Sequence, residues 1–318
     1  MKIGMKLITT QSCRFALSAI CLVGALAESH AQAPAFGERV DLGEIEYQAL
    51  REASGLVASR QNANVFWTHN DSGDKNRIYA FNENGKHLGV YTIARAYARD
   101  WEDIAIGPGP EDGKQYLYLG DIGNNEERFR KQYVYRVLEP SVSAQQAPAQ
   151  ETLTEVEGII FSYPERNHDA EALMLDPLTK DLYVVTKMDS NVIVFRAAYP
   201  QSTTETVTLE RVIALPFTLA VAGDISPAGD EILIKTYDSI YYWKRVAGQS
   251  IAQALAQAPQ RVPYLLEPQG EAVCWKADGM GYYTLSEERF NIQAQLYFYP
   301  RMRQTPPKNK VRPPSRTQ

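Results

Sequence analysis

The chain has 318 residues, with 33 Lys and Arg against 38 Asp and Glu, and a formal net charge of −5. Such an acidic chain lacks the positive field that nucleic-acid phosphates require, so the charge argues against nucleic acid as a partner. The length is ample for one large β domain with its own core.

The first 33 residues have the pattern of a secretory signal peptide. A basic stretch with Lys2, Lys6 and Arg14 precedes an apolar run over 15–27, and an Ala-Gln-Ala sequence ends at Ala33. The apolar run is short for a membrane span. We therefore expect cleavage after Ala33, with Ala31 as the alternative site, no membrane span, and a protein in the periplasm or outside the cell.

Five segments of the chain resemble one another and mark the starts of five repeats. Each is a short, mostly apolar strand candidate, followed by a turn and a second strand rich in aromatic and β-branched residues. Repeats with periods of about 20–50 residues indicate solenoids, propellers or arrays. The five segments are 53–57, 101–105, 170–174, 222–226 and 270–274.

Each repeat continues into further strands, separated by turns such as the Asn84-Gly85 hairpin signal. A Gln/Ala/Pro insertion over 144–150 predicts a surface loop, and 249–258 predicts a short helix or a loop. The strands expected after the five segments are 64–69, 77–81 and 87–92; 115–119, 132–138 and 158–163; 181–186, 191–196 and 209–215; 231–236, 239–244 and 261–266; and 281–286 and 295–299.

The fifth repeat lacks a fourth strand, whereas the N-terminal part has a spare one over 39–45. Pairing the two would close a ring and remove exposed sheet edges. The sequence therefore predicts an all-β propeller over 34–300, with five four-stranded blades and the N-terminal strand closing the last. Six blades remain an alternative, because the second repeat is unusually long. Residues 301–318 hold six cations and no acid, and their Pro-rich composition predicts a disordered tail.

Carboxylates recur at one point of the repeat. Glu102, Glu171 and Glu271 share a slot in three repeats, and Asp103 and Asp224 take the next slot. Innermost strands line the channel of a propeller, so these side chains should converge there. Converging carboxylates repel one another unless a cation or a shared proton relieves them, and Ca²⁺ prefers oxygen ligands. A Ca²⁺ site is therefore the hypothesis, and solvated or amide-capping carboxylates are the alternative.

A second polar set follows the second strands, over 69–73, 120–125, 186–189, 236–238 and 286–289. His69 and His168 are the histidines best placed for proton transfer, with a structural role as the alternative. Glu102 completes the predicted catalytic residues, and Lys187 either pairs with the glutamates or binds an anion. The predicted metal ligands are Glu102, Asp103, Glu171, Glu271 and Asp121.

The stretches 54–56, 67–73, 100–105 and 120–125 carry a family resemblance. They resemble a group of secreted bacterial β-propeller proteins of mostly unassigned function, which are similar in turn to phytase-like and SdiA-regulated propellers. In phytase-like relatives, acidic side chains on the top and in the channel of the propeller bind Ca²⁺. The resemblance implies the same role for the acidic slots of this chain.

Three functions are compatible with these observations. The first is an exported Ca²⁺-binding propeller that hydrolyses a phosphoester, ester or lactone. The second is a non-catalytic propeller, monomeric, that binds a small molecule or a protein on its loop face. The third, by analogy of fold alone, is a glycosidase with inward carboxylates. The sequence has no zinc-type Cys/His spacing, phosphate loop or Gly-x-Ser-x-Gly motif.

Overall fold

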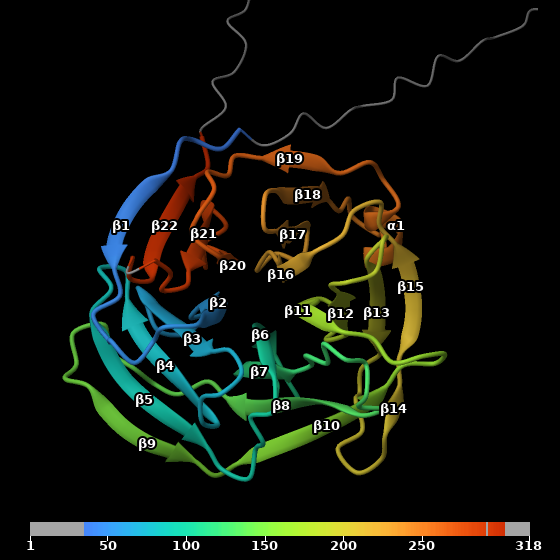
Figure 1. Cartoon of the computed structure of the whole chain (residues 1–318), viewed down its shortest axis with the longest axis horizontal. Coiled ribbons are helices and arrows are strands. Elements are labelled where there is room, and N and C mark those ends of the chain that lie inside the picture. The colour runs from blue at the N-terminus through green and yellow to red at the C-terminus, as the bar shows by residue number, and fades with distance from the viewer. Residues whose placement is uncertain (1–34, 291, 303–318) are drawn as a thin grey trace, which may run out of the picture. The chain divides into compact units, whose positions relative to one another are not determined.

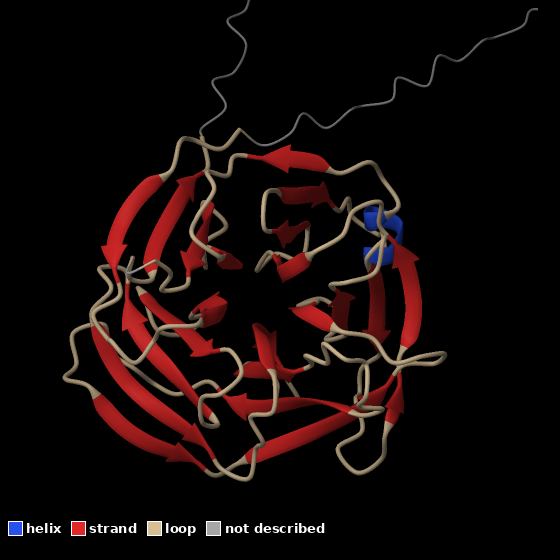
Figure 2. Ribbon diagram, in the orientation of Figure 1, coloured by secondary structure: helices blue, strands red, loops and turns tan. Residues whose placement is uncertain are grey.

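The chain forms a five-bladed β-propeller (Figure 1, Figure 2) in a computed structural model that describes residues 35–290 and 292–302. Five sheets, whose strands pair mainly antiparallel, stand around a central axis, and the strand formed by each of the five repeat segments lies innermost in its sheet. The predicted fold is therefore confirmed, with five blades rather than six. The predicted signal peptide and all of the predicted tail beyond Met302 lie outside the described residues.

The first two blades each carry a fifth, outer strand in addition to the predicted four. Both extra strands pair in parallel with the fourth strand of their blade. The predicted surface loop over 144–150 is partly wrong, because its last two residues begin the extra strand β9. Blade 1 contains β2 (Ala53–Ala58), β3 (Val65–Asn70), β4 (Arg77–Asn82), β5 (His87–Ile93) and β9 (Ala149–Leu153). Blade 2 contains β6 (Trp101–Pro108), β7 (Gln115–Asp121), β8 (Gln132–Leu138), β10 (Val156–Ser162) and β14 (Val207–Thr208).

The third and fourth blades have the predicted four strands, and a five-residue helix lies where the sequence offered a helix or a loop. The helix α1 (Ile251–Leu255) starts at Ser250, whose side chain accepts a hydrogen bond from the backbone of Gln253. Blade 3 contains β11 (Ala170–Leu175), β12 (Leu182–Thr186), β13 (Ile193–Ala197) and β15 (Glu210–Ala214). Blade 4 contains β16 (Ala220–Ile225), β17 (Glu231–Thr236), β18 (Ile240–Lys244) and β19 (Gln260–Val262).

The fifth blade is completed by the N-terminal strand, as the sequence predicts. Strand β1 pairs antiparallel with β22, and Val40 lies opposite Phe298. The pairing joins the first described strand to the last blade and closes the ring (Figure 1). Blade 5 contains β20 (Gly270–Trp275), β21 (Gly281–Ser286), β22 (Gln295–Pro300) and β1 (Val40–Glu44).

Five hydrophobic clusters, one between each pair of neighbouring blades, form the core. Successive residues of an inner strand enter opposite clusters: Leu173 packs toward blade 2, while Ala172 and Met174 pack toward blade 4. Because side chains alternate across a strand, both faces of each inner strand are buried. This explains why the repeat segments are almost continuously apolar. Cys274, the one cysteine within residues 35–290 and 292–302, is a fully buried member of the cluster between blades 5 and 1.

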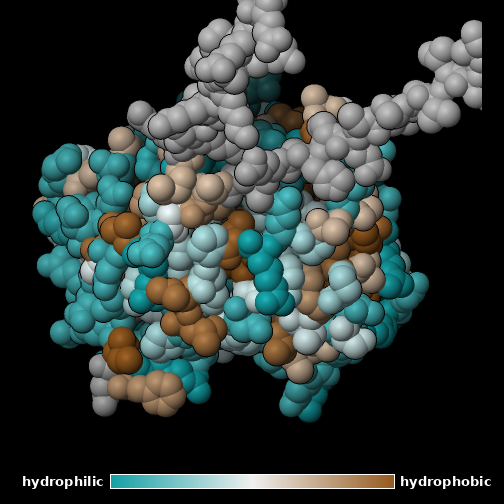
Figure 3. Space-filling model, turned by 90° about the horizontal axis from the view of Figure 1, so that it is seen from above, coloured by the Kyte–Doolittle hydropathy of each residue, from teal (hydrophilic) through white to brown (hydrophobic). Residues whose placement is uncertain are grey.

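The outer wall beside β1, β22 and β19 mixes hydrophilic and hydrophobic residues, the latter in scattered groups (Figure 3). Within residues 35–290 and 292–302, no helix is long and apolar enough to cross a membrane.

Candidate functional site

Each innermost strand begins with a β-bulge at the same end of the channel. In every blade the register of the first two strands shifts near the start of the inner strand. A bulge leaves one residue unpaired and changes the direction of its side chain. The five bulges thus gather side chains from five strands at one mouth of the channel. The residues within these register shifts are Ser54 and Gly55 in blade 1, and Glu102, Glu171, Val221 and Glu271 in the other four blades.

The strand register confirms the predicted equivalence of the three glutamates and corrects the alignment of the fourth blade. Val221, rather than Gly223, stands in the glutamate slot of β16. Asp224 therefore lies two residues farther along its strand than the position equivalent to Asp103. The two aspartates belong to different levels of the channel.

A second set of equivalent positions surrounds the same mouth. The residue opposite the first inner-strand position is the last residue of the second strand in every blade. The next residue in each chain segment enters the turn beside the bulge. These turn residues are Asp71, Ile122, Lys187, Tyr237 and Glu287. The second strands thus end on the face that the sequence predicted.

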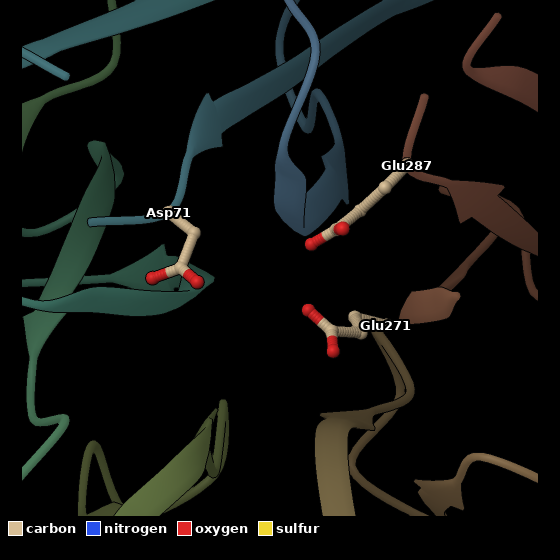
Figure 4. A group of neighbouring side chains, drawn as sticks. All are labelled: Asp71, Glu271 and Glu287. Atoms are coloured by element: carbon tan, nitrogen blue, oxygen red, sulfur yellow. The ribbon is translucent and has the colours of Figure 1, made fainter. Parts of the chain in front are cut away.

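Two groups of three carboxylates lie close enough to share a cation. In one, Asp71 meets Glu271 and Glu287; in the other, Asp71 meets Asp100 and Glu102. Within each group the ligand oxygens lie within 4.8 Å of one another. Glu271 and Glu287 point toward each other from blade 5, and Asp71 faces them from blade 1 (Figure 4). Glu171 lies at the equivalent bulge of blade 3. We name the set formed by Asp71, Asp100, Glu102, Glu171, Glu271 and Glu287 the acidic mouth.

One cation and one phenol are built into the acidic mouth. Lys187 forms an ion pair with Glu171, so the predicted pairing of this lysine is observed. Its ammonium also lies 5.4 Å from the centre of the Tyr237 ring, and the Tyr237 hydroxyl donates a 2.6 Å hydrogen bond to Oε1 of Glu271. Within residues 35–290 and 292–302, Lys187 is the cation that forms an ion pair with a carboxylate of the acidic mouth, and this pair involves Glu171 alone.

Burial and mutual repulsion raise the pKa of several carboxyl groups of the acidic mouth. Burial, opposed by Lys187, raises the pKa of Glu171 to about 8. Burial and a hydrogen bond with Glu271 raise the pKa of Glu287 to about 10. Burial and the neighbouring carboxylates raise the pKa of Asp71 to about 6, and burial together with Glu171 raises that of Glu102 well above its usual range. A positive charge bound at the acidic mouth would relieve the repulsion that contributes to these raised pKa values.

Gly123 provides the space that two of the carboxylates occupy. A Cβ at this position would collide with Oε1 of Glu102 and Oδ2 of Asp100. The backbone N–H of Gly123 donates a 3.1 Å hydrogen bond to the carbonyl of Asp100. Glycine is thus needed here because the two carboxylates pack directly against the backbone.

The two predicted catalytic histidines lie apart from the two carboxylate groups. The ring of His69 is buried behind Gly55, where an added Cβ would stand 2.6 Å from its Nε2, and its Nδ1 contacts the Asn70 carbonyl at 2.9 Å. Burial lowers the pKa of His69 to about 4. The Nδ1 of His168 lies 3.0 Å from Oδ2 of Asp189. Proton transfer by either histidine stays a prediction.

Asp103 binds backbone amides of three blades. Its Oδ1 accepts from the N–H of Ile104 at 2.8 Å, and its Oδ2 accepts from those of Leu173 at 2.9 Å and Gly223 at 3.3 Å. The inner edge of each blade has no neighbouring strand on the channel side, so its buried N–H groups need other acceptors. Burial raises the pKa of Asp103 against the effect of these donors. Its geometry is that of an amide cap, the alternative that the sequence left open.

Asp121 supports the acidic mouth from behind. Its Oδ1 accepts a 2.8 Å hydrogen bond from the backbone N–H of Asp100 and lies 3.9 Å from Nε of Arg99.

Of the predicted metal ligands, the structure brings Glu102 and Glu271 into the two carboxylate groups. It places Glu171 in an ion pair and leaves Asp103 and Asp121 outside the groups, as far as residues 35–290 and 292–302 show.

Three members of the carboxylate groups were absent from the predicted ligands: Asp71, Asp100 and Glu287. Asp71 and Glu287 belong to the polar turns after the second strands, and Asp100 precedes Glu102 by two residues. The signal was therefore in the sequence. To recognise these residues as ligands, one needs the pairing register of the first two strands in blades 1 and 5, which shows that Asp71 and Glu287 occupy equivalent positions.

Neither a model of a protein family nor a curated protein matches the chain. Solved structures match it by fold. The WD40 repeats of RRP9 share 13% identity and a TM-score of 0.41, over 85% of this chain and 99% of that chain. A nidogen/laminin complex shares 11% identity and a TM-score of 0.46, over 76% and 74% of the two chains. A luciferin-regenerating enzyme shares 11% identity and a TM-score of 0.43, over 84% and 95%. All three are β-propeller proteins, and likeness at this level does not extend to function.

Proposed function

We propose that the acidic mouth binds a divalent cation, with Ca²⁺ as the first candidate, and that the propeller uses this site to bind a ligand on the same face. The observation that carries the proposal is the pair of carboxylate groups that share Asp71. Ca²⁺ bonds to oxygen at about 2.3–2.6 Å, so oxygens on opposite sides of one ion are about 4.8 Å apart. The oxygens of each group fall within that span.

The resemblance to secreted bacterial propellers, which are similar in turn to phytase-like and SdiA-regulated propellers, points in the same direction. The leader expected at residues 1–33 adds export to the proposal. Extracellular Ca²⁺ modules have dissociation constants of about 0.1–1 mM. We therefore expect an affinity in that range. The ligand on the loop face would be a small molecule or a protein segment.

Hydrolysis is a second candidate, favoured by one observation. Glu171 has a pKa raised to about 8 by burial and lies against Lys187, and a general acid works best when its pKa is near the working pH. A cation at the mouth would polarise a phosphoester, ester or lactone. Activity on such substrates, lost in Glu171→Gln, would support this candidate; its absence would leave the binding function intact.

The cation proposal is tested by calorimetric titration of residues 34–318 with Ca²⁺. Asp71→Asn removes the carboxylate common to both groups, and Gly123→Ala displaces two others. Each should weaken binding by about 100-fold or more, since even supporting groups around metals contribute about 10–100-fold.

Gly158→Ala is the matched control, because an added Cβ there meets no atom within 4 Å. It should bind Ca²⁺ as the unmodified protein does. No heat of binding in the unmodified protein, or equal affinity in Asp71→Asn, would contradict the proposal.

A further inference from the structure

The opposite mouth of the channel contains a pocket of a different character. It has a volume of about 380 Å³ and is lined by residues at or just beyond the far ends of all five inner strands. These include Arg60, Pro108, Pro177, Ile225 and Ala277, one from each blade. Its lining mixes polar groups with the apolar side chains of two isoleucines and three prolines. Its volume falls in the range of about 300–1,000 Å³ that is typical of small-molecule sites.

Arg60 is the one charged residue among the described residues that line this pocket. Its side chain is only 10% exposed, and its Nη2 lies 3.9 Å from Oδ2 of Asp224. A guanidinium has five N–H donors. Within residues 35–290 and 292–302, its one hydrogen-bond acceptor is the carbonyl of Ala58, at 3.4 Å from Nη1. Most of its donors are therefore available to a molecule in the pocket.

The neighbouring Asp224 sets the charge that such a molecule should carry. Its Oδ2 also accepts a 2.8 Å hydrogen bond from the backbone N–H of Trp275, which holds the carboxylate beside Arg60. One guanidinium beside one carboxylate leaves little net positive charge. A single-charged anion is thus better matched to the pocket than a dianion, which Asp224 would repel.

We propose that this pocket, at the mouth opposite the acidic mouth, binds a monocarboxylate with an apolar body. The carboxylate would accept two parallel hydrogen bonds from Arg60, the geometry in which arginine binds carboxylates most strongly. The apolar body would pack against the prolines and Ile225. The inner strands have six to eight residues, so the two mouths are about 20 Å apart at about 3.3 Å per residue. The proposal is therefore independent of the cation site.

Benzoate is a suitable probe, with benzyl alcohol as its uncharged counterpart. We expect calorimetry in the presence of EDTA to detect benzoate binding to residues 34–318, and at least tenfold weaker binding of benzyl alcohol. Arg60→Gln should weaken benzoate binding by about tenfold or more, the usual effect of losing a hydrogen bond to a charged group. Lys276→Gln is the matched control, since it removes a cation from the same face that pairs with Asp278.

Ala277→Phe provides a second variant, in case Arg60→Gln does not fold. Ala277 lies in an exposed turn, and a phenyl ring there would fill the pocket without removing the guanidinium, so benzoate binding should be lost. Asp71→Asn should bind benzoate normally, which separates this site from the acidic mouth. The proposal is overturned if benzoate does not bind the unmodified protein, if it binds Arg60→Gln or Ala277→Phe equally well, or if benzyl alcohol binds as tightly.

Discussion

At the scale of single residues, acidic side chains of the channel have two distinct roles. Asp103 has both oxygens occupied by backbone N–H groups from three blades. Asp71 instead meets other carboxylates. The first arrangement stabilises the fold, because buried amides without acceptors cost about 1–3 kcal/mol each. The second has unfavourable repulsion that a bound cation would relieve.

Asp103→Asn should separate these roles. The amide group of asparagine would replace one accepting oxygen with a donor that faces backbone N–H groups. We expect the free energy of unfolding to fall by about 1–3 kcal/mol, measured by urea denaturation, while the Ca²⁺ affinity of the folded protein stays unchanged. Loss of Ca²⁺ affinity with unchanged stability would instead make Asp103 a ligand.

The raised pKa of Glu287 predicts a pH dependence of stability. Because its pKa in the folded protein is about 10 and in an unfolded chain about 4.3, the folded state retains a proton that the unfolded state releases. The contribution of Glu287 to the free energy of unfolding is therefore fully present below about pH 4 and is lost as the pH rises toward 10. In EDTA, the melting temperature of the unmodified protein should therefore fall more steeply between pH 6 and 9 than that of Glu287→Gln.

Glu288→Gln is the control for that comparison, because the carboxylate of the neighbouring Glu288 pairs with the exposed Arg51 instead of lying in the acidic mouth. It should follow the unmodified protein. Burial lowers the pKa of Lys235 to about 8 and gives an opposite slope, but this slope is common to all three proteins. Parallel curves for Glu287→Gln and the unmodified protein would show that Glu287 is not protonated in the folded state.

At the scale of elements, the repeated bulge and the closing strand account for the arrangement of the site. The bulges place the glutamates, and the turns after the second strands place Asp71 and Glu287 beside them. Strand β1 then holds blade 5, which carries Glu271 and Glu287, against blade 1, which carries Asp71. Closure of the ring is therefore a condition for one of the two carboxylate groups.

Deletion of residues 34–46 should destabilise the propeller. It exposes the edge of β22 and removes Ile45, which is buried between blades 5 and 1. Loss of one such core side chain alone costs about 2–5 kcal/mol. The melting temperature should therefore fall by about 10 °C or more. Deletion of residues 303–318 is the control and should leave it unchanged. An equally small effect of both deletions would contradict closure by β1.

The sequence predicted the strand order and the closing strand because apolar segments, Asn-Gly turns and a missing fourth strand are local features. It did not predict β9 and β14, since both are short outer strands that depend on the neighbouring edge. The same limit applies to the site. The shared position of Glu102, Glu171 and Glu271 is visible as a repeat in the sequence. The placing of Val221 at the equivalent position of blade 4 depends on the bulge, and the approach of Asp71 to Glu287 depends on ring closure.

At the scale of the whole molecule, the two mouths of one channel have opposite chemical characters. Carboxylates from blades 1, 2, 3 and 5 gather where the inner strands begin. Arg60 lines a pocket of prolines, isoleucines and polar groups where these strands end. Five clusters between the blades hold both mouths in place. The proposed cation site and the proposed anion site therefore lie on opposite faces of the propeller.

The most direct test of the cation site is a crystal structure of residues 34–318 grown with Ca²⁺. The account predicts a cation at the acidic mouth, bonded to Asp71 and to members of at least one of its two carboxylate groups at about 2.3–2.6 Å. A mouth that contains only water at saturating Ca²⁺, or a cation bound elsewhere and not to Asp71, would contradict it.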